Sequence, residues 1–289
     1  MKQVDAPSQL QWLALSLSPN IGAATLNNLL EYFDQDLDAI LESPSYELVR
    51  VRGVGAKIAS EIGAIDLDRL ARDLEAWRAD GIEILMRGGQ HYPPPLKETS
   101  DLPLALFTSS IMEPEIWSKA VAIVGTREPS NEARYITLQL AMQLARAERA
   151  VVSGLALGID TAAHAGALSA DGVTVAVLGS GIVNIYPEAN RPLARRIREK
   201  GALLSETHPS WSANAQRLVS RNRIISGLSR AVIVVESDAD GGAMYTARFA
   251  GEQGRPVYTF DLPAGGNQQL IADGARVLRR DDPLRDLPG

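Results

Sequence analysis

Cysteine is absent from the 289-residue chain, and the only histidines are His91, His164 and His208. Without cysteine the chain can form neither a disulfide nor a thiolate metal site. Three scattered histidines give no basis for a histidine metal cluster either. We therefore expect no metal and no cofactor, and the lack of cysteine suits a reducing, cytoplasmic location.

Long apolar runs are also missing. No stretch of 18 apolar residues occurs, so we expect no membrane span and no membrane partner. The first residues, MKQVDAPSQLQ, lack the basic segment and apolar core of a signal peptide. The formal net charge of −6 argues against indiscriminate binding to nucleic acid. Any cationic binding surface must therefore be local.

Helical patterns fill the first 65 residues. Apolar residues recur at helical spacing over 10–18, 23–33 and 56–62, with breaks at 19–22 and 51–55. A short helix, the turn Gly53-Val54-Gly55 and a second helix are typical of a helix-hairpin-helix. Its turn can offer backbone N–H groups to a phosphate, but a plain helical bundle with glycine C-caps fits as well. We expect a helix-hairpin-helix (SAM-like) domain over residues 1–65.

Strands and helices alternate later in the chain. After a helix over 67–79 and short strands at 82–86 and 104–108, Tyr92 to Leu96 should form a rigid extended segment. From residue 119 apolar runs are separated by helical segments at 132–146, 160–170, 188–200, 220–228 and 243–253. This order predicts an α/β fold, an extended Rossmann-like, mostly parallel sheet covered on both faces. We expect it to span residues 66–289.

Small residues follow the predicted strands. Ligands bind at the carboxyl ends of parallel strands, where glycines leave space and helix N-termini add partial positive charge. We therefore expect a phosphate-binding pocket, although tight βα turns alone would also explain the glycines. No loop matches G-x-G-x-x-G or a Walker A loop, so neither NAD nor ATP is expected in its usual mode. The candidates are Gly125, Thr126, Arg127, Ser153, Gly154, Gly158, Gly179, Ser180, Gly181, Gly241 and Gly242.

Positive charge is concentrated in one later segment. No Asp or Glu lies between Glu206 and Glu236, an interval that holds Arg217, Arg221, Arg223 and Arg230. Arginine can grip phosphate bidentately and stack on bases, and Asn222 can bond a base edge. We therefore add Arg217, Arg221, Asn222 and Arg223 to the binding candidates. The arginines at 191, 195 and 198 fit an ordinary solvated helix face.

Signals for catalysis are weak. Several carboxylates fall near strand ends and could hold Mg²⁺ or act in acid–base chemistry, but we favour helix capping and neutralisation of nearby arginines as their role. These are Asp160, Glu206, Glu236, Asp238 and Asp240. His164 is interpreted as a structural hydrogen-bond partner. We therefore predict a protein without catalytic residues.

Several long motifs resemble the DNA-processing protein A (DprA/Smf) family. They occur in the family's order, beside the helical N-terminus and the YPPPL segment. The motifs are VAIVGTREPS (121–130), VVSGLALGIDTAAHAGAL (151–168), AVLGSGIVNIYPEANRPL (176–193), SRNRIISGLS (220–229) and GNQQLIADGA (266–275).

The resemblance implies a specific function. Members of the family bind and protect incoming single-stranded DNA, load the RecA recombinase in natural transformation, and are typically homodimers. Carried over by motif, Gly125 and Arg127 of the Gly-x-Arg loop and Arg221, Asn222 and Arg223 of the RNRIISG loop are phosphate-contact candidates.

The sequence departs from the family at three places. Leu218-Val219 stands where Phe-Pro is common. The usual run Ser-Gly-Ser/Ala-Leu-Ile-Thr-Ala is replaced by Gly241-Gly242-Ala243-Met244-Tyr245-Thr246-Ala247. The length leaves no room for the winged-helix domain that many members carry, so its roles are not expected here.

Two other functions stay open. One is a phosphoribohydrolase-like nucleotide-processing enzyme, although the Gly-Thr and glutamate expected after its Gly-Gly loop are missing. The other is a nucleotide-sensing module.

Overall fold

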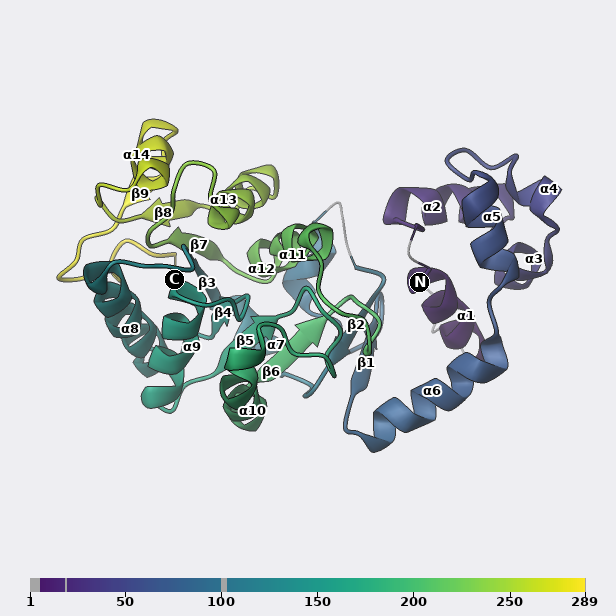
Figure 1. The fold of residues 1–289 in the computed structure, drawn as a ribbon, viewed down its shortest axis with the longest axis horizontal. Helices are drawn as coiled ribbons and strands as arrows, with labels where there is room; N and C mark the ends of the chain where they lie inside the picture. Colours follow the sequence, from purple (N-terminus) through teal and green to yellow (C-terminus); the bar gives the residue numbers. More distant parts are fainter. Residues whose placement is uncertain (1–5, 19, 100–102, 289) are drawn as a thin grey trace. The chain divides into compact units, whose positions relative to one another are not determined.

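A computed structural model describes residues 6–18, 20–99 and 103–288 of the chain. The chain forms two compact units (Figure 1). The first comprises Met1–Tyr92 with Asp101–Leu106, and the second comprises Pro93–Ser100 with Phe107–Gly289. The expected domain boundary after residue 65 stays a prediction.

The first unit is mainly helical. Asp36 and Asp66 cap α3 and α6 by accepting the backbone N–H groups of Ala39 and Arg69 at 3.0 and 2.8 Å. Gly53 takes a positive φ of 84° in the turn before α5, a conformation that favours glycine. The order of α4, this turn and α5 agrees with the short helix, glycine turn and second helix expected from the sequence. The elements are α1 (Ala6–Ser16), α2 (Ala23–Tyr32), α3 (Leu37–Glu42), α4 (Ser45–Leu48), α5 (Ala56–Gly63), α6 (Leu67–Ala79) and β1 (Glu83–Met86).

A nine-stranded, mostly parallel sheet runs in the order β1-β2-β6-β5-β4-β3-β7-β8-β9. Strands β3 to β9 pair in parallel with their neighbours, and β2 pairs with β6 antiparallel. Every residue of β3 to β7 is buried, as expected for a sheet covered on both faces. This confirms the predicted fold class. The remaining strands are β2 (Ala105–Thr108), β3 (Val121–Val124), β4 (Val151–Ser153), β5 (Thr174–Val177), β6 (Ala202–Ser205), β7 (Ala231–Val234), β8 (Val257–Thr259) and β9 (Arg276–Val277).

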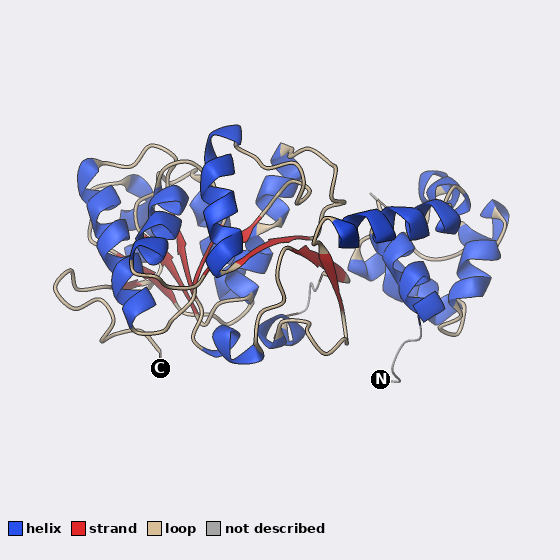
Figure 2. Cartoon of the chain, turned by 90° about the horizontal axis from the view of Figure 1, so that it is seen from below, coloured by secondary structure: helices blue, strands red, loops and turns tan. Residues whose placement is uncertain are grey.

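Helices cover both faces of this sheet, with α8, α9 and α10 on one side and α12 and α13 on the other (Figures 1 and 2). Ala and Leu side chains of α8 and α9 pack with β3 and β7 in one hydrophobic core. Ser130 caps α8 by accepting the N–H of Ala133 at 3.1 Å. These helices are α7 (Pro114–Ser118), α8 (Asn131–Arg146), α9 (Ile159–Ser169), α10 (Arg191–Lys200), α11 (Ala215–Ser220), α12 (Asn222–Gly227), α13 (Gly242–Glu252) and α14 (Gly265–Ala272).

The strand order places the topological switch point beside β3. From β3 the chain moves through β4 and β5 to β6, and then returns to β7 on the other side of β3. In open α/β sheets the crevice at the carboxyl end of such a reversal is the usual ligand site. The carboxyl ends of β3 and β7 are therefore where a site is expected.

Three local expectations were wrong. Pro94–Glu98 forms a 3-10 helix instead of an extended segment, because a proline φ near −65° suits both, and Leu96 N–H reaches Pro93 O at 3.2 Å. The helix expected over 188–200 begins with a 3-10 turn, Glu188–Asn190, before α10. Residues 220–228 do not form a single helix: Ser220 ends α11, and α12 follows it.

Candidate nucleic-acid interface

A cavity of about 530 Å³ lies at the switch point. Its walls come from the turn after β3, the segment joining α11 to α12, and the N-terminus of α13. Seven of the predicted binding residues line it: Gly125, Thr126, Arg127, Arg221, Asn222, Gly241 and Gly242. The structure therefore brings these seven residues together around one cavity, while their role in binding stays a prediction.

The turn after β3 is tied to its neighbours through the backbone. The N–H of Thr126 donates to Glu236 O at 2.7 Å, and the carbonyl of Thr126 accepts from Ile159 N at 3.1 Å. These bonds hold the turn to the segment after β7 and to the start of α9. Arg127 follows with an exposed side chain, and over the described ranges no acidic group forms an ion pair with it. Its guanidinium is therefore available to an anion.

Close backbone approach explains several of the predicted glycines. A Cβ on Gly125 would meet Ile159 Cγ1 at 2.5 Å and Glu236 O at 2.8 Å. Gly158 combines a φ of 78° with a similar clash, because its Cβ would lie 2.4 Å from Thr126 O. These glycines let the turn after β3 lie against the start of α9. This close contact therefore lies beside the cavity, which Gly125 lines.

Arg221 is buried, with 7% of its surface exposed. Its Nη1 donates to Gly154 O and to Val177 O, each at 2.5 Å. Burial lowers the pKa of this guanidinium, while the nearby Asp160 carboxylate opposes the shift. Arg221 thus lies in the cavity wall, where it joins the ends of β4 and β5.

Asp160 holds the loop between β4 and α9. One of its carboxylate oxygens accepts the N–H groups of Gly154 and Ala156, both at 3.1 Å. Burial raises the pKa of the Asp160 carboxyl, whereas the charge of Arg221 and the two N–H donors oppose that rise. Leu155 in this loop has a left-handed φ of 63°, which costs about 1–3 kcal/mol outside glycine and persists only where neighbours fix it.

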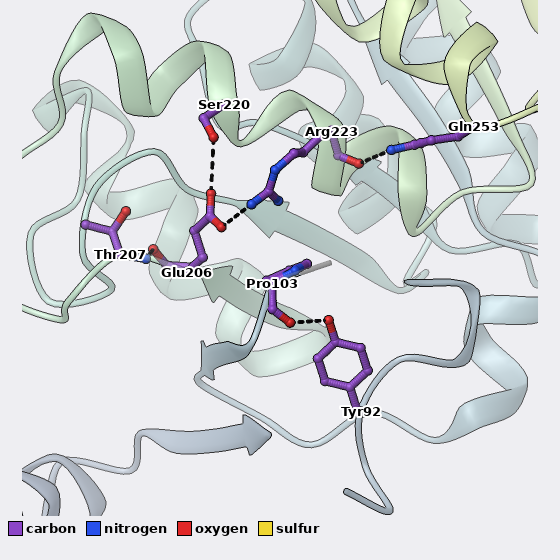
Figure 3. Close-up of polar contacts among 8 residues, drawn as sticks. Tyr92, Pro103, Glu206, Thr207, Ser220, Arg223 and Gln253 are labelled. Atoms are coloured by element: carbon purple, nitrogen blue, oxygen red, sulfur yellow. Dashed lines mark hydrogen bonds and ion pairs between the residues drawn. The ribbon is translucent and has the colours of Figure 1, made fainter. Parts of the chain in front are cut away.

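Arg223 is paired with an acid (Figure 3). Its Nη2 lies 2.5 Å from Glu206 Oε2, and 11% of the arginine side chain is exposed. Ser220 donates to the other Glu206 oxygen at 3.5 Å, and Gln253 donates to the Arg223 carbonyl at 2.9 Å. Figure 3 also draws the Tyr92 hydroxyl, which donates to the Pro103 carbonyl at 2.6 Å within the first unit. Arg223 therefore meets a carboxylate at the place where the sequence suggested a phosphate.

Arg217 lies over an aromatic ring. Its guanidinium carbon is 4.7 Å from the centroid of Trp211, which also stacks on His208 at 5.4 Å. Nη1 of Arg217 donates to Ser212 O at 2.8 Å. Arg217 does not line the 530 Å³ cavity.

The remaining candidates lie in the protein interior. Ser153 is fully buried and donates to Ile123 O at 2.7 Å. Gly181 packs on the backbone of the loop after β6, since a Cβ there would lie 2.1 Å from His208 O. Gly179, Ser180 and Gly181 are all buried and do not line the 530 Å³ cavity.

Helix α13 presents its N-terminus to the cavity through Gly241, Gly242 and Ala243. The Gly241 N-cap has no side-chain hydrogen bond to cap the helix. The first N–H groups of a helix lack intrahelical partners and carry partial positive charge, so they suit an anion. Glu128 and Asp238 also line the cavity, so its charge is mixed and favours an anion only near Arg127 and α13.

His164 is buried away from this cavity. Its Nδ1 lies 2.7 Å from Thr174 Oγ1, whose own hydrogen goes to Val151 O at 2.8 Å. Nδ1 must therefore carry the proton, and Nε2 has no partner among the described residues. Burial, followed by the charge of Arg221, lowers the pKa of His164 to about 3. The predicted structural role agrees with this geometry.

Sequence reasoning missed a second, small part of the site. A cavity of about 40 Å³ shares Arg127, Ala156, Leu218 and Arg221 with the larger one. Gly154, which was predicted, lines it, and so do Leu157, Tyr186 and Pro187, which were not. Tyr186 and Leu157 are exposed apolar residues in loops, and no phosphate-binding pattern marks such residues in a sequence.

The described residues also bear on two other kinds of feature, a membrane span and a metal site. None of the helices there is both long enough and apolar enough to cross a membrane. Within the same ranges, no group of three or more His, Asp or Glu side chains is placed to hold a metal ion.

The fold and the cavity define a Rossmann-like α/β protein with its candidate site at the topological switch point. The sequence profile of the family DNA recombination-mediator protein A matches residues 83–287. The DNA processing protein DprA of Bacillus subtilis (strain 168) is 36% identical over 267 residues, which are 90% of each chain. The chain therefore belongs to the DNA recombination-mediator protein A family, as the motifs indicated.

Solved structures agree with this membership. The X-ray structure of DNA processing protein A from Streptococcus pneumoniae matches with a TM-score of 0.79 and 29% identity, over 97% of this chain and 98% of that one. A Helicobacter pylori DNA processing protein A, whose single-stranded DNA binding mode has been described, matches with a TM-score of 0.63 and 26% identity, over 72% of this chain and 97% of that one.

Proposed function

We propose that this protein binds single-stranded DNA at the carboxyl edge of its sheet, with a backbone phosphate between Arg127 and the N-terminus of α13. The observation that carries the proposal is the exposed Arg127, without an ion pair in the described part of the chain, beside uncapped helix N–H groups in the switch-point cavity. Family membership and the H. pylori relative support the choice of ligand.

Binding of this kind is electrostatic and tolerant of sequence. When arginine or a helix N-terminus neutralises a phosphate, the DNA releases counterions. The logarithm of the association constant should therefore fall with the logarithm of the salt concentration, with a slope of about −0.7 for each phosphate contacted. Because the net charge is −6, contact should be confined to this edge of the sheet.

We further propose the wider role that the family resemblance implies. The protein protects incoming single-stranded DNA and loads RecA in natural transformation, acts as a homodimer, and works by binding without catalysis. Strand exchange by RecA on DNA coated with single-strand-binding protein tests the loading step, and light scattering tests the dimer.

Anisotropy titration of labelled oligo(dT) against a duplex of equal length, across a salt series, tests the binding proposal. We expect tighter binding of the single strand. Equal or tighter binding of the duplex would contradict it. Release of free base from nucleoside monophosphates would instead favour the phosphoribohydrolase alternative.

A further inference from the structure

One exposed aromatic side chain lies next to the proposed phosphate site. Tyr186 is 47% exposed and lines the 40 Å³ cavity together with Arg127 and Leu157, which is itself 45% exposed. Within the part of the chain that the structure describes, Tyr186 makes no hydrogen bond and no ring contact, and it is the sole aromatic residue lining either cavity. Its ring is therefore available to a ligand.

The loop that carries Tyr186 is fixed to the loop that carries Leu157. Asn190, buried and four residues beyond Tyr186, donates to Leu155 O at 2.8 Å and to Ala156 O at 3.2 Å. Asp160 holds Ala156 from the other side. These hydrogen bonds join the loops that carry Tyr186 and Leu157, and both residues line the small cavity that Arg127 also lines.

Two other aromatic rings of this unit, those of Trp211 and Tyr245, already make contacts with neighbouring side chains. Trp211 stacks on His208 and lies beneath Arg217. Arg248 lies over the ring of Tyr245, at 5.2 Å from the centroid. Leu218 lines the same small cavity as Tyr186 and is not aromatic. A planar apolar ligand at this edge therefore has Tyr186 as its available partner.

We propose that Tyr186, with Leu157 beside it, is the nucleobase-stacking site of this interface, which takes a base next to the phosphate held by Arg127. The inference rests on the proposed binding of single-stranded DNA. A volume of about 40 Å³ holds little more than one water, so the base would lie on the exposed ring and not enter the cavity. Stacking on an aromatic side chain is sequence-tolerant because every base has a π face.

Two oligomers of equal charge separate stacking from phosphate contact. One is dT20, and the other is a 20-unit abasic deoxyribose-phosphate chain without bases. For Tyr186→Ala we expect dT20 affinity to fall by at least about fivefold, with an unchanged salt slope and unchanged binding of the abasic chain. Tyr186→Phe should bind dT20 like wild type. Tyr135→Ala, at a tyrosine that is 64% exposed and lines neither cavity, is the matched control, and thermal unfolding checks that each variant is folded.

Each other outcome has a defined meaning. Unchanged dT20 binding by Tyr186→Ala, or an equal loss with the abasic chain, would overturn the stacking site while leaving the proposed function intact. Wild-type protein that binds neither oligomer would overturn the proposed function, and the stacking site with it.

Discussion

Arginines that look alike in the sequence have different environments in the structure. Arg221 donates to two backbone carbonyls and Arg223 pairs with Glu206, whereas Arg127 is exposed without an ion pair among the described residues. A motif such as RNRIISG gives residue type but not burial, because burial depends on strands far away in sequence. The position of Arg127 could be predicted, because any residue just after β3 must reach the switch point.

Replacing Arg127 with alanine tests its role at the interface. Loss of one charge-assisted phosphate contact should weaken dT20 binding about tenfold or more and reduce the salt slope by about 0.7. Anisotropy titrations at several salt concentrations measure both. Arg146→Ala, at an exposed residue ending α8, is the control and should match wild type. If Arg127→Ala keeps the wild-type slope, no phosphate lies at Arg127.

The buried charge of Arg221 should make Asp160 a stability residue. Asp160→Ala removes the neighbouring anion and frees two backbone N–H groups. We expect the free energy of unfolding to fall by about 3 kcal/mol, measured by urea denaturation. Asp160→Asn keeps an acceptor oxygen and should lose less. Equal stability of wild type and Asp160→Ala would show that Asp160 does not hold this loop.

At the scale of elements, the sequence predicted the alternation of strands and helices well. Buried strands such as β3 and β7 read as continuous apolar runs. Helix α14 and strand β9 were not predicted, because GGNQQLIA carries two glycines and β9 is two residues long. The 3-10 helix at Pro94 was missed for a different reason, since a proline φ does not distinguish the two conformations.

Glycines at the site should differ in their tolerance of a methyl group. Gly125→Ala forces contact with Ile159 and with Glu236 O, so we expect a loss of about 1–3 kcal/mol in unfolding free energy. Gly242→Ala meets nothing within 4 Å and should change stability by less than about 0.5 kcal/mol. Thermal or urea unfolding of the two variants measures this difference. Similar losses of unfolding free energy in both would contradict the close approach at Gly125.

At the scale of the whole molecule, His164 makes stability depend on pH. Its pKa is about 3 in the folded chain against 6.5 ordinarily, so below pH 6.5 the unfolded chain binds a proton that the folded chain does not. The free energy of unfolding should therefore fall as pH falls, by up to about 1.4 kcal/mol per pH unit.

Urea denaturation between pH 7.5 and 5 measures this dependence. His164→Gln should flatten it, while His91→Gln, at an exposed histidine, should leave it unchanged. An identical slope in wild type and His164→Gln would show that folding does not lower the pKa of this imidazole.

The central claim is that one edge of the sheet binds the backbone of a single strand through Arg127. Its most direct test is the salt dependence of dT20 binding by wild type and by Arg127→Glu, beside a duplex of equal length. The account predicts that wild type prefers the single strand, and that Arg127→Glu binds more weakly with a shallower slope. Wild-type affinity and slope retained in Arg127→Glu would contradict it.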